Sequence, residues 1–198
     1  MAYQELERLG NELSENGHAK TSFDLLEIVD FRRLANNLSD VVSRNSQLQP
    51  ERIVSRIGMI MCKDPESKAA GSRVMQPVVE ALFPGSLASM TKWDMYTVNQ
   101  YEVGHFFSPH QDYLDGTVII VTTTGVRRID IYKKEEDDVF NEVTASHEVH
   151  EGEILLLNGY RDLGHSAQCI VGPSISVVGD VSRSLPSIEV INELGTNK

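Results

Sequence analysis

Two histidines and one aspartate in this chain have the residue types and spacing of metal ligands. His110 and Asp112 stand two residues apart in "FFSPHQDY", and His165 follows in "LGHSAQ". If the first two lie on a β-strand, their side chains point to the same face, because side chains alternate along a strand. Two imidazoles and one carboxylate are the ligand set of non-haem iron sites with open positions. The pair alone is a weak signal, since a strand that faces solvent carries the same residues.

The segments that must position these residues change in character near residue 90. Before that point, amphipathic patterns at helical spacing predict helices over residues 2–16 and 31–45. An Asp-Pro start and a Pro-Gly end predict a third helix over residues 65–83. Residues 52–62 alternate weakly and predict one strand.

After residue 90, apolar runs rich in β-branched residues alternate with glycine breaks, which predicts many short strands. The runs are "WDMYTVNQY", "GTVIIVTTT", "GVRRIDIYKK", "NEVTASHEVH", "GEILLLNG", "HSAQCIVG" and "SISVVGDV". This pattern is typical of an antiparallel barrel or jelly roll, so the fold class is α+β. We expect one domain over 1–198, with a mainly helical layer over 1–90, a β core over 91–185 and a tail over 186–198.

Charge and composition narrow the classes of partner. The chain of 198 residues has a formal net charge of −11. Nucleic-acid-binding proteins usually show a basic patch, and a negative chain repels phosphate at long range, so the charge argues against a DNA or RNA substrate. No signal peptide is recognisable, and no apolar run reaches the ~20 residues of a membrane span. With two cysteines in apolar surroundings, these features favour a cytoplasmic protein without a membrane partner.

The sequence around these residues resembles the Fe(II)- and 2-oxoglutarate-dependent dioxygenases. That family has a double-stranded β-helix, a cupin-like jelly-roll barrel, and approaches its first ligand with Tyr-x-x-Gly ahead of His-x-Asp. The matching stretches are "YEVGHFFSPHQD", "EGEILLLNG" and the pair Gly164-His165. The resemblance covers residues 93–181 and implies that His110, Asp112 and His165 hold Fe(II).

The same resemblance implies 2-oxoglutarate and O₂ as cosubstrates. The implied reaction is hydroxylation or oxidative demethylation of a small molecule, an amino acid or a peptide side chain. Within the family, the stretch "VNQYEVGHFFSPHQD" is most similar to the AlkB-type branch. In that branch, the residues that match Asn99 and Tyr101 contact 2-oxoglutarate. An AlkB-like nucleic-acid demethylase is therefore a second hypothesis. A non-catalytic barrel that binds a ligand or a partner protein is a third.

The segment after His165 departs from the family pattern. Most members hold the distal carboxylate of 2-oxoglutarate with an arginine or lysine on this segment. Ser176 stands at the position of the motif's serine and, with Tyr101, is expected to assist, but Ser174 stands where the family has arginine. A buried carboxylate without a partner is costly, so a dicarboxylate in a barrel needs a cation from elsewhere. The missing arginine is also the main argument for the non-catalytic hypothesis.

Two other arginines are candidates for that cation. Arg127 shares a strand face with Ile129 and Ile131, and this apolar face is predicted to point into the barrel. Its "GVRR" setting resembles the strand from which members similar to asparaginyl hydroxylases supply their basic anchor. Arg161, on the loop ahead of His165, is the alternative. Arg127 is the favoured residue, and an ion pair at the barrel rim is its ordinary structural interpretation.

Overall fold

The computed structural model describes residues 3–21, 25–27, 30–48, 53–56, 59–83, 92–112, 116–133, 140–158 and 163–181. The helices are α1 (Tyr3–Asn16), α2 (Phe31–Leu48) and α3 (Pro65–Leu82), with a short 3₁₀ helix η1 (Leu25–Glu27). The strands are β1 (His18–Lys20), β2 (Ile53–Arg56), β3 (Met59–Cys62), β4 (Trp93–Tyr101), β5 (Phe106–His110), β6 (Thr117–Lys133), β7 (Val143–His150), β8 (Ile154–Asn158) and β9 (Leu163–Val181). Within the described residues, no helix is both long and apolar enough to cross a membrane.

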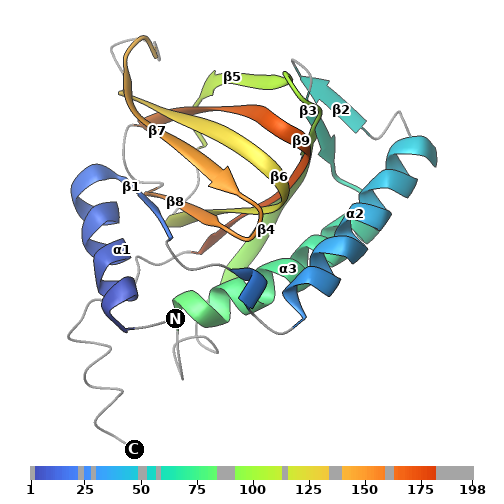
Figure 1. Cartoon of the computed structure of the whole chain (residues 1–198), viewed down its shortest axis with the longest axis horizontal. Helices are drawn as coiled ribbons and strands as arrows, with labels where there is room; N and C mark the ends of the chain where they lie inside the picture. The colour runs from blue at the N-terminus through green and yellow to red at the C-terminus, as the bar shows by residue number, and fades with distance from the viewer. Residues whose placement is uncertain are drawn as a thin grey trace, which may run out of the picture.

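The strands form two antiparallel layers that share the long strands β6 and β9. The larger layer has the order β1-β8-β6-β9-β4-β3-β2, and the smaller has the order β7-β6-β9-β5. The first half of β6 and the second half of β9 belong to the larger layer, and their other halves belong to the smaller one. Figure 1 shows α2 and α3 side by side on one side of this barrel and α1 beyond β1. The α+β class and the double-stranded β-helix predicted from the sequence are confirmed.

Hydrophobic side chains pack on both faces of the larger layer. Ile119 and Val121 of β6 join the helices in one cluster, whereas Val118 and Ile120 join the other cluster inside the barrel. Because neighbouring side chains on a strand point to opposite faces, a strand buried on both faces is apolar throughout. This explains the continuous run "TVIIV" at the start of β6.

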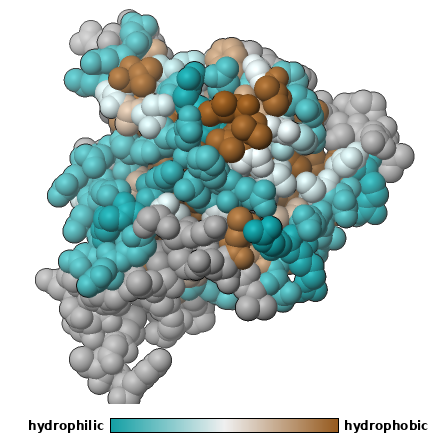
Figure 2. All heavy atoms as spheres, in the orientation of Figure 1, coloured by the Kyte–Doolittle hydropathy of each residue, from teal (hydrophilic) through white to brown (hydrophobic). Residues whose placement is uncertain are grey.

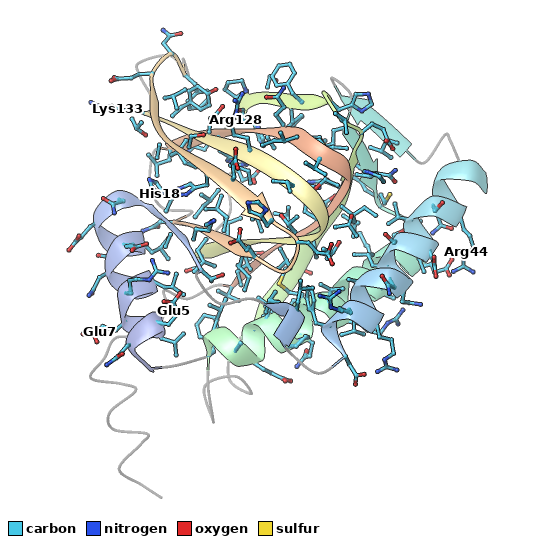
Figure 3. All side chains as sticks on the ribbon, in the orientation of Figure 1. Glu5, Glu7, His18, Arg44, Arg128 and Lys133 are labelled. Atoms are coloured by element: carbon cyan, nitrogen blue, oxygen red, sulfur yellow. The ribbon has the colours of Figure 1, made fainter. Side chains whose placement is uncertain are left out.

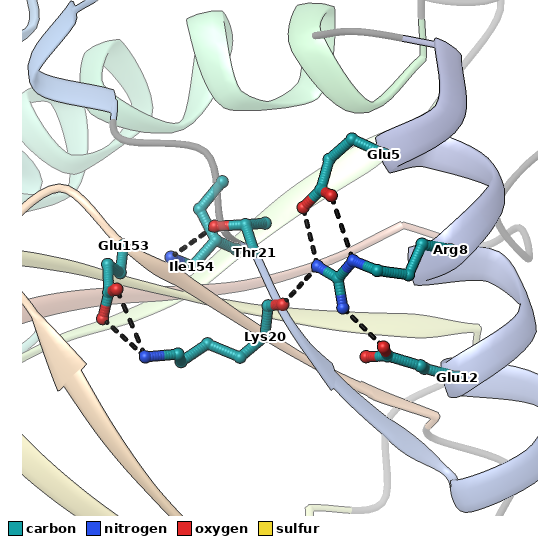
Figure 4. A network of polar contacts seen from close by, with 7 residues as sticks. All are labelled: Glu5, Arg8, Glu12, Lys20, Thr21, Glu153 and Ile154. Carbon is teal, nitrogen blue, oxygen red and sulfur yellow. Dashed lines mark hydrogen bonds and ion pairs between the residues drawn. The ribbon is translucent and has the colours of Figure 1, made fainter.

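Polar contacts fasten α1 to the edge of the larger layer (Figure 4). Arg8 pairs with Glu5 and Glu12 of its own helix at 2.7 and 2.6 Å and donates to the backbone oxygen of Lys20 at 2.8 Å. The amino group of Lys20 lies 3.1 Å from the carboxylate of Glu153, just ahead of β8. Partly exposed ion pairs of this kind each contribute at most about 1 kcal/mol. The backbone pairing of β1 with β8 adds to them.

The visible surface is mostly hydrophilic over α1, whereas apolar side chains gather above β5 and β9 (Figure 2). Within β5, β9 and the turn ahead of β5, the exposed apolar residues are Val103, Phe106, Ile170 and Val171. They come from segments that lie side by side, since the Gly104 N–H donates to the Cys169 carbonyl at 3.1 Å. No helix covers the outer face of the smaller layer in the part of the chain that the structure describes (Figure 1).

The structure confirms the three predicted helices and corrects several strands. Asp64 accepts a hydrogen bond from the Ser67 N–H at 2.8 Å, so it caps α3 as the Asp-Pro pair indicated. The prediction of one strand over 52–62 was wrong, because β2 and β3 form a hairpin with Ile53 opposite Cys62. β1 was missed, since three residues are too few to show a period. The division at residues 90 and 185 stays a prediction, and the tail over 186–198 lies outside the described residues.

The glycine breaks predicted inside β6 and β9 are bends within continuous strands, so each pair of predicted strands is one strand. In β6 the bend falls at Gly125, whose φ of +73° is left-handed and favours glycine. The pairing of β6 with β9 shifts register on both sides of it. In β9 the bend falls at Gly172-Pro173. The bends let each strand pass from one layer to the other.

Replacing Gly125 with alanine is expected to lower the free energy of unfolding by at least about 2 kcal/mol. The left-handed conformation alone costs a non-glycine residue about 1–2 kcal/mol, and the new Cβ would meet the Val171 carbonyl oxygen. Gly10→Ala is the matched control, since its Cβ meets no atom within 4 Å and alanine favours a helix by about 0.5–1 kcal/mol. Urea unfolding of the two variants measures both effects. Equal urea midpoints for Gly125→Ala and the wild type would contradict the left-handed backbone and the close contact at Gly125.

Candidate active site

The structure brings His110, Asp112 and His165 together at one place in the barrel. His110 ends β5 and lies opposite His165 of β9 in the antiparallel pair. One ligand atom from each of the three residues lies within 4.8 Å of the others. The two carboxylate oxygens of Asp112 are each 3.7 Å from an imidazole Nε2, one of His110 and one of His165. These separations are too long for hydrogen bonds, so three donor atoms converge on a shared space.

The contacts of the two rings suit metal ligation. The Nδ1 of His110 lies 2.9 Å from the backbone oxygen of Ser108, which places the ring proton on Nδ1 and leaves Nε2 directed at the cluster. Burial lowers the pKa of His165 to about 4; His110 acts in the same direction and Asp112 opposes it. Burial and the neighbouring His110 thus favour the neutral imidazole of His165, which is the form that binds a metal ion. Two imidazoles and a carboxylate therefore fit a divalent iron ion.

A cavity of about 210 Å³ opens beside the three residues and extends to Arg127. About half of its wall is apolar, and this part includes Phe107, Ile129 and Val178. Ligand pockets commonly combine such a wall with a few placed polar groups. Here the polar groups gather at the two ends, with the three converging donors at one and the guanidinium at the other.

The Arg127 side chain is held by four hydrogen bonds inside the barrel. Its Nε donates to the Ser174 hydroxyl at 2.9 Å, and its Nη1 donates to the Ser176 hydroxyl at 2.5 Å. Its Nη2 donates to the backbone oxygens of Ser174 and Asn99, at 3.0 and 3.2 Å. The guanidinium also lies over the Tyr101 ring, 4.5 Å from the ring centre. These contacts fix its position in the cavity wall.

Arg127 is a buried cation whose contacts within the described residues are all neutral. It is 2% exposed, and each of its hydrogen-bond acceptors is a hydroxyl or a backbone oxygen. Burial lowers the pKa of Arg127 to about 10, so the group is still charged at neutral pH. A buried charge without a counter-charge costs several kcal/mol. A guanidinium has five N–H donors, and the four bonds leave one of them for a ligand.

Tyr101 and Asn99 lie beside this cation. The Tyr101 hydroxyl donates to the Met59 sulfur at 3.0 Å, and a thioether is a weak acceptor. Burial raises the pKa of Tyr101 to about 12, against an opposing effect of Arg127, so the hydroxyl remains a donor. The Asn99 side-chain oxygen accepts from the Thr97 hydroxyl at 3.3 Å. A carboxylate that enters the cavity offers Tyr101 a better acceptor than sulfur.

Asn99, Tyr101, Arg127 and Ser176, the residues that the sequence suggested for the cosubstrate, all line the cavity together with the three donors. Their roles as cosubstrate contacts remain predictions. Arg161, the alternative anchor, lies outside the described residues.

The inward orientation predicted for Arg127 is confirmed. Its neighbours of the same parity, Ile129 and Ile131, are buried, whereas Arg128 is exposed. The alternation of apolar and polar residues along β6 carried this prediction.

Two residues of the cavity region were missed. Ser174 was noted only as the position without an arginine, yet its hydroxyl is a close partner of Arg127. Its parity with Ser176 on one strand is the signal that was overlooked. Met59 of β3 gave no signal, because the sequence does not show that β3 pairs with β4.

Comparison with known proteins rests on structures. No protein-family model and no curated protein matches the sequence. A prolyl hydroxylase from Trichoplax adhaerens, solved with a peptide of the hypoxia inducible factor oxygen degradation domain, aligns over 89% of each chain at 13% identity with a TM-score of 0.50. A Pseudomonas putida prolyl-4-hydroxylase aligns over 90% of this chain and 98% of its own, at 14% identity and TM-score 0.47.

The ribosomal oxygenase YcfD of Escherichia coli, solved with cobalt and 2-oxoglutarate, aligns over 70% of this chain at 19% identity with a TM-score of 0.42. The aligned part spans 35% of that longer protein. At such identities the likeness concerns the fold, and the Trichoplax enzyme carries the comparison. The chain therefore has the double-stranded β-helix fold of the Fe(II)- and 2-oxoglutarate-dependent oxygenases.

Proposed function

We propose that this protein is an Fe(II)- and 2-oxoglutarate-dependent oxygenase. In this proposal His110, Asp112 and His165 hold Fe(II), and Arg127 binds the distal carboxylate of 2-oxoglutarate. The observation that carries it is a buried cation with neutral partners, in the same cavity as three converging metal-ligand atoms. A dicarboxylic 2-oxo acid supplies both ends of that cavity with what they lack, a chelating group for the metal and an anion for the guanidinium.

The residues of the chain have separate tasks. Iron with O₂ and the 2-oxo acid supplies the oxidising chemistry. His110, Asp112 and His165 would hold the ion, and a set of three protein ligands leaves room for a chelating cosubstrate. Ser174 and Ser176 fix the Arg127 guanidinium. The Tyr101 hydroxyl, which lies beside that guanidinium, would donate to the distal carboxylate of 2-oxoglutarate. The apolar part of the wall, which includes Phe107, Ile129 and Val178, would limit water around the ion pair and so strengthen it.

The substrate class that we propose has less direct support. We propose hydroxylation, or oxidative demethylation, of a small molecule, an amino acid or a peptide side chain. The Trichoplax prolyl hydroxylase of similar fold was solved with a peptide. The net charge of −11 disfavours a phosphate-rich substrate. We further propose a cytoplasmic location, which the two free thiols of Cys62 and Cys169 support.

The proposed function is tested by adding Fe(II) and then 2-oxoglutarate to the protein without oxygen. We expect the weak visible absorption band of an Fe(II)-bound 2-oxo acid, and release of succinate once air is admitted. Pyruvate, a 2-oxo acid without a distal carboxylate, is the control. It is expected to bind at least tenfold more weakly, because it leaves Arg127 without an anion. Absence of the band at saturating 2-oxoglutarate would contradict the proposed function and favour a non-catalytic barrel.

A further inference from the structure

Two histidines far apart in sequence meet outside the cavity, which neither of them lines. The Nδ1 of His18 lies 3.0 Å from the Nε2 of His147, and the rings meet edge to face at 68°. His18 begins β1 and His147 lies within β7. Neither ring nitrogen in this contact is engaged by any other described residue.

The pair bridges the edges of the two layers. Within the described residues β1 pairs with β8 and β7 pairs with β6, so each is the last strand of its layer. His18 lies beside the end of α1, on the side where β7 crosses (Figure 3). Lys20 makes a second bridge, because its amino group donates to the Glu148 backbone oxygen at 3.0 Å.

One carboxylate acts on both rings. Glu12 of α1 favours the protonated form of His18 and of His147 through its negative charge. Its carboxylate does not cluster with the two rings as they stand, because the one group of three such ligand residues among the described residues is His110, Asp112 and His165. One of its oxygens is bound to Arg8 at 2.6 Å, and the other has no partner among the described residues (Figure 4). The positive charge of Lys20 is balanced by Glu153 at 3.1 Å. Burial is the largest effect on each ring and lowers the pKa of both, which favours neutral imidazoles.

We propose that His18 and His147 form a second metal site, which takes a transition-metal ion such as Zn²⁺, and that the Glu12 side chain turns toward the ion to supply a third ligand. At the usual Zn–N distance of about 2.0–2.1 Å and the tetrahedral angle, two neighbouring ligand nitrogens are separated by about 3.3–3.4 Å. The observed separation of 3.0 Å is shorter by about 0.3–0.4 Å, so the two rings must move slightly apart to bind the ion. Imidazole ligands select zinc, copper or nickel, whereas magnesium and calcium prefer sites made of oxygen alone.

Binding needs a change of tautomer and a turn of the two rings. Without metal, one neutral imidazole donates its N–H to the other across the 3.0 Å contact. With metal, that ring carries its proton on its outer nitrogen instead, and both inner lone pairs face the ion. No proton is released overall. The ion then links the edges of both layers and α1, so it stabilises the barrel without touching the cavity.

The test is the number of Zn²⁺ ions bound per chain, measured by calorimetry and by metal analysis after dialysis. The wild type is expected to bind two ions, one at His110, Asp112 and His165 and one at this pair. His147→Gln and His18→Gln are each expected to bind one. His165→Ala, which disables the cavity site, should also retain one, and its melting temperature should still rise with Zn²⁺.

His150→Gln is the matched control, because His150 is an exposed histidine of the same strand that lies outside the pair. It is expected to bind two ions, and Glu12→Gln should weaken the second site at least tenfold. His18→Gln and His147→Gln lie on different strands, so loss of one ion in both is not explained by a folding defect in a single variant. Retention of both ions in His18→Gln and His147→Gln would overturn the site. So would a wild type that binds a single ion, lost in His165→Ala.

Discussion

His165→Ala is expected to reduce the affinity for Fe(II) more than 100-fold. Loss of a partner that only orients a metal ligand typically costs about 10–100-fold, and this change removes a ligand itself. His165 is a buried residue whose Nε2 lies 3.7 Å from the Asp112 carboxylate, so the variant leaves one imidazole and one carboxylate. Anaerobic titration with Fe(II) measures the loss. The 2-oxoglutarate absorption band is expected to vanish in the same variant.

His105→Ala is the control for that experiment. His105 stands five positions before His110, outside the cluster, and its Nδ1 accepts a hydrogen bond from the Glu102 N–H at 3.3 Å. Its removal is expected to change Fe(II) affinity by less than twofold. Wild-type affinity in His165→Ala, or an equal loss in both variants, would show that iron is not held where the three donor atoms converge.

How far the sequence predicts this site depends on strand pairing. His110 and His165 meet because β5 pairs with β9, and no periodicity within either strand reveals that contact. Alternation also left open whether the face of His110 is interior. Phe107 and His110 both line the cavity although three positions apart, because the register shifts between them. Such an irregularity defeats parity arguments, so the ligand set was indicated only by resemblance.

The ends of several strands were also poorly predicted from the sequence, whereas the ends of the helices were predicted well. The three helices were predicted to within three residues at their ends, because the first two show an apolar period over several turns and the third has clear start and stop signals. Glycines, however, mark a turn and a bend alike. Gly125 therefore suggested the end of a strand where β6 continues and crosses from one layer to the other.

The absent arginine on β9 also has a structural explanation. Ser174 stands where the family pattern has arginine, but the space beside it is filled by Arg127 from the neighbouring strand. The two serines of β9 then serve as acceptors for a guanidinium that arrives from β6. The absence of an arginine at position 174 was the main argument for a non-catalytic barrel. That argument is weaker now, because a neighbouring strand supplies a cation to the same place.

Arg127→Gln is expected to reduce the affinity for 2-oxoglutarate at least about 100-fold while Fe(II) affinity changes little. Removing one partner of a buried charge pair costs about 3–5 kcal/mol, and each 1.4 kcal/mol is a factor of ten. Glutamine keeps a donor but loses the charge and the paired N–H geometry of the guanidinium. The measurement is titration of the Fe(II)-loaded protein with 2-oxoglutarate in the absence of oxygen.

Arg128→Gln separates this effect from a general loss of positive charge. Arg128 is the next residue of the same strand, but it is exposed, donates to Gln168 at 2.8 Å and lies 3.5 Å from Asp130. It is expected to bind 2-oxoglutarate within twofold of the wild type.

Pyruvate provides a second control, because it has no distal carboxylate. Its affinity should be nearly the same in Arg127→Gln and in the wild type. If instead Arg127→Gln lost pyruvate and 2-oxoglutarate in equal proportion, the arginine would support the cavity wall rather than bind the distal carboxylate. If it lost neither, the anchor would lie elsewhere, and Arg161 would be the next residue to replace.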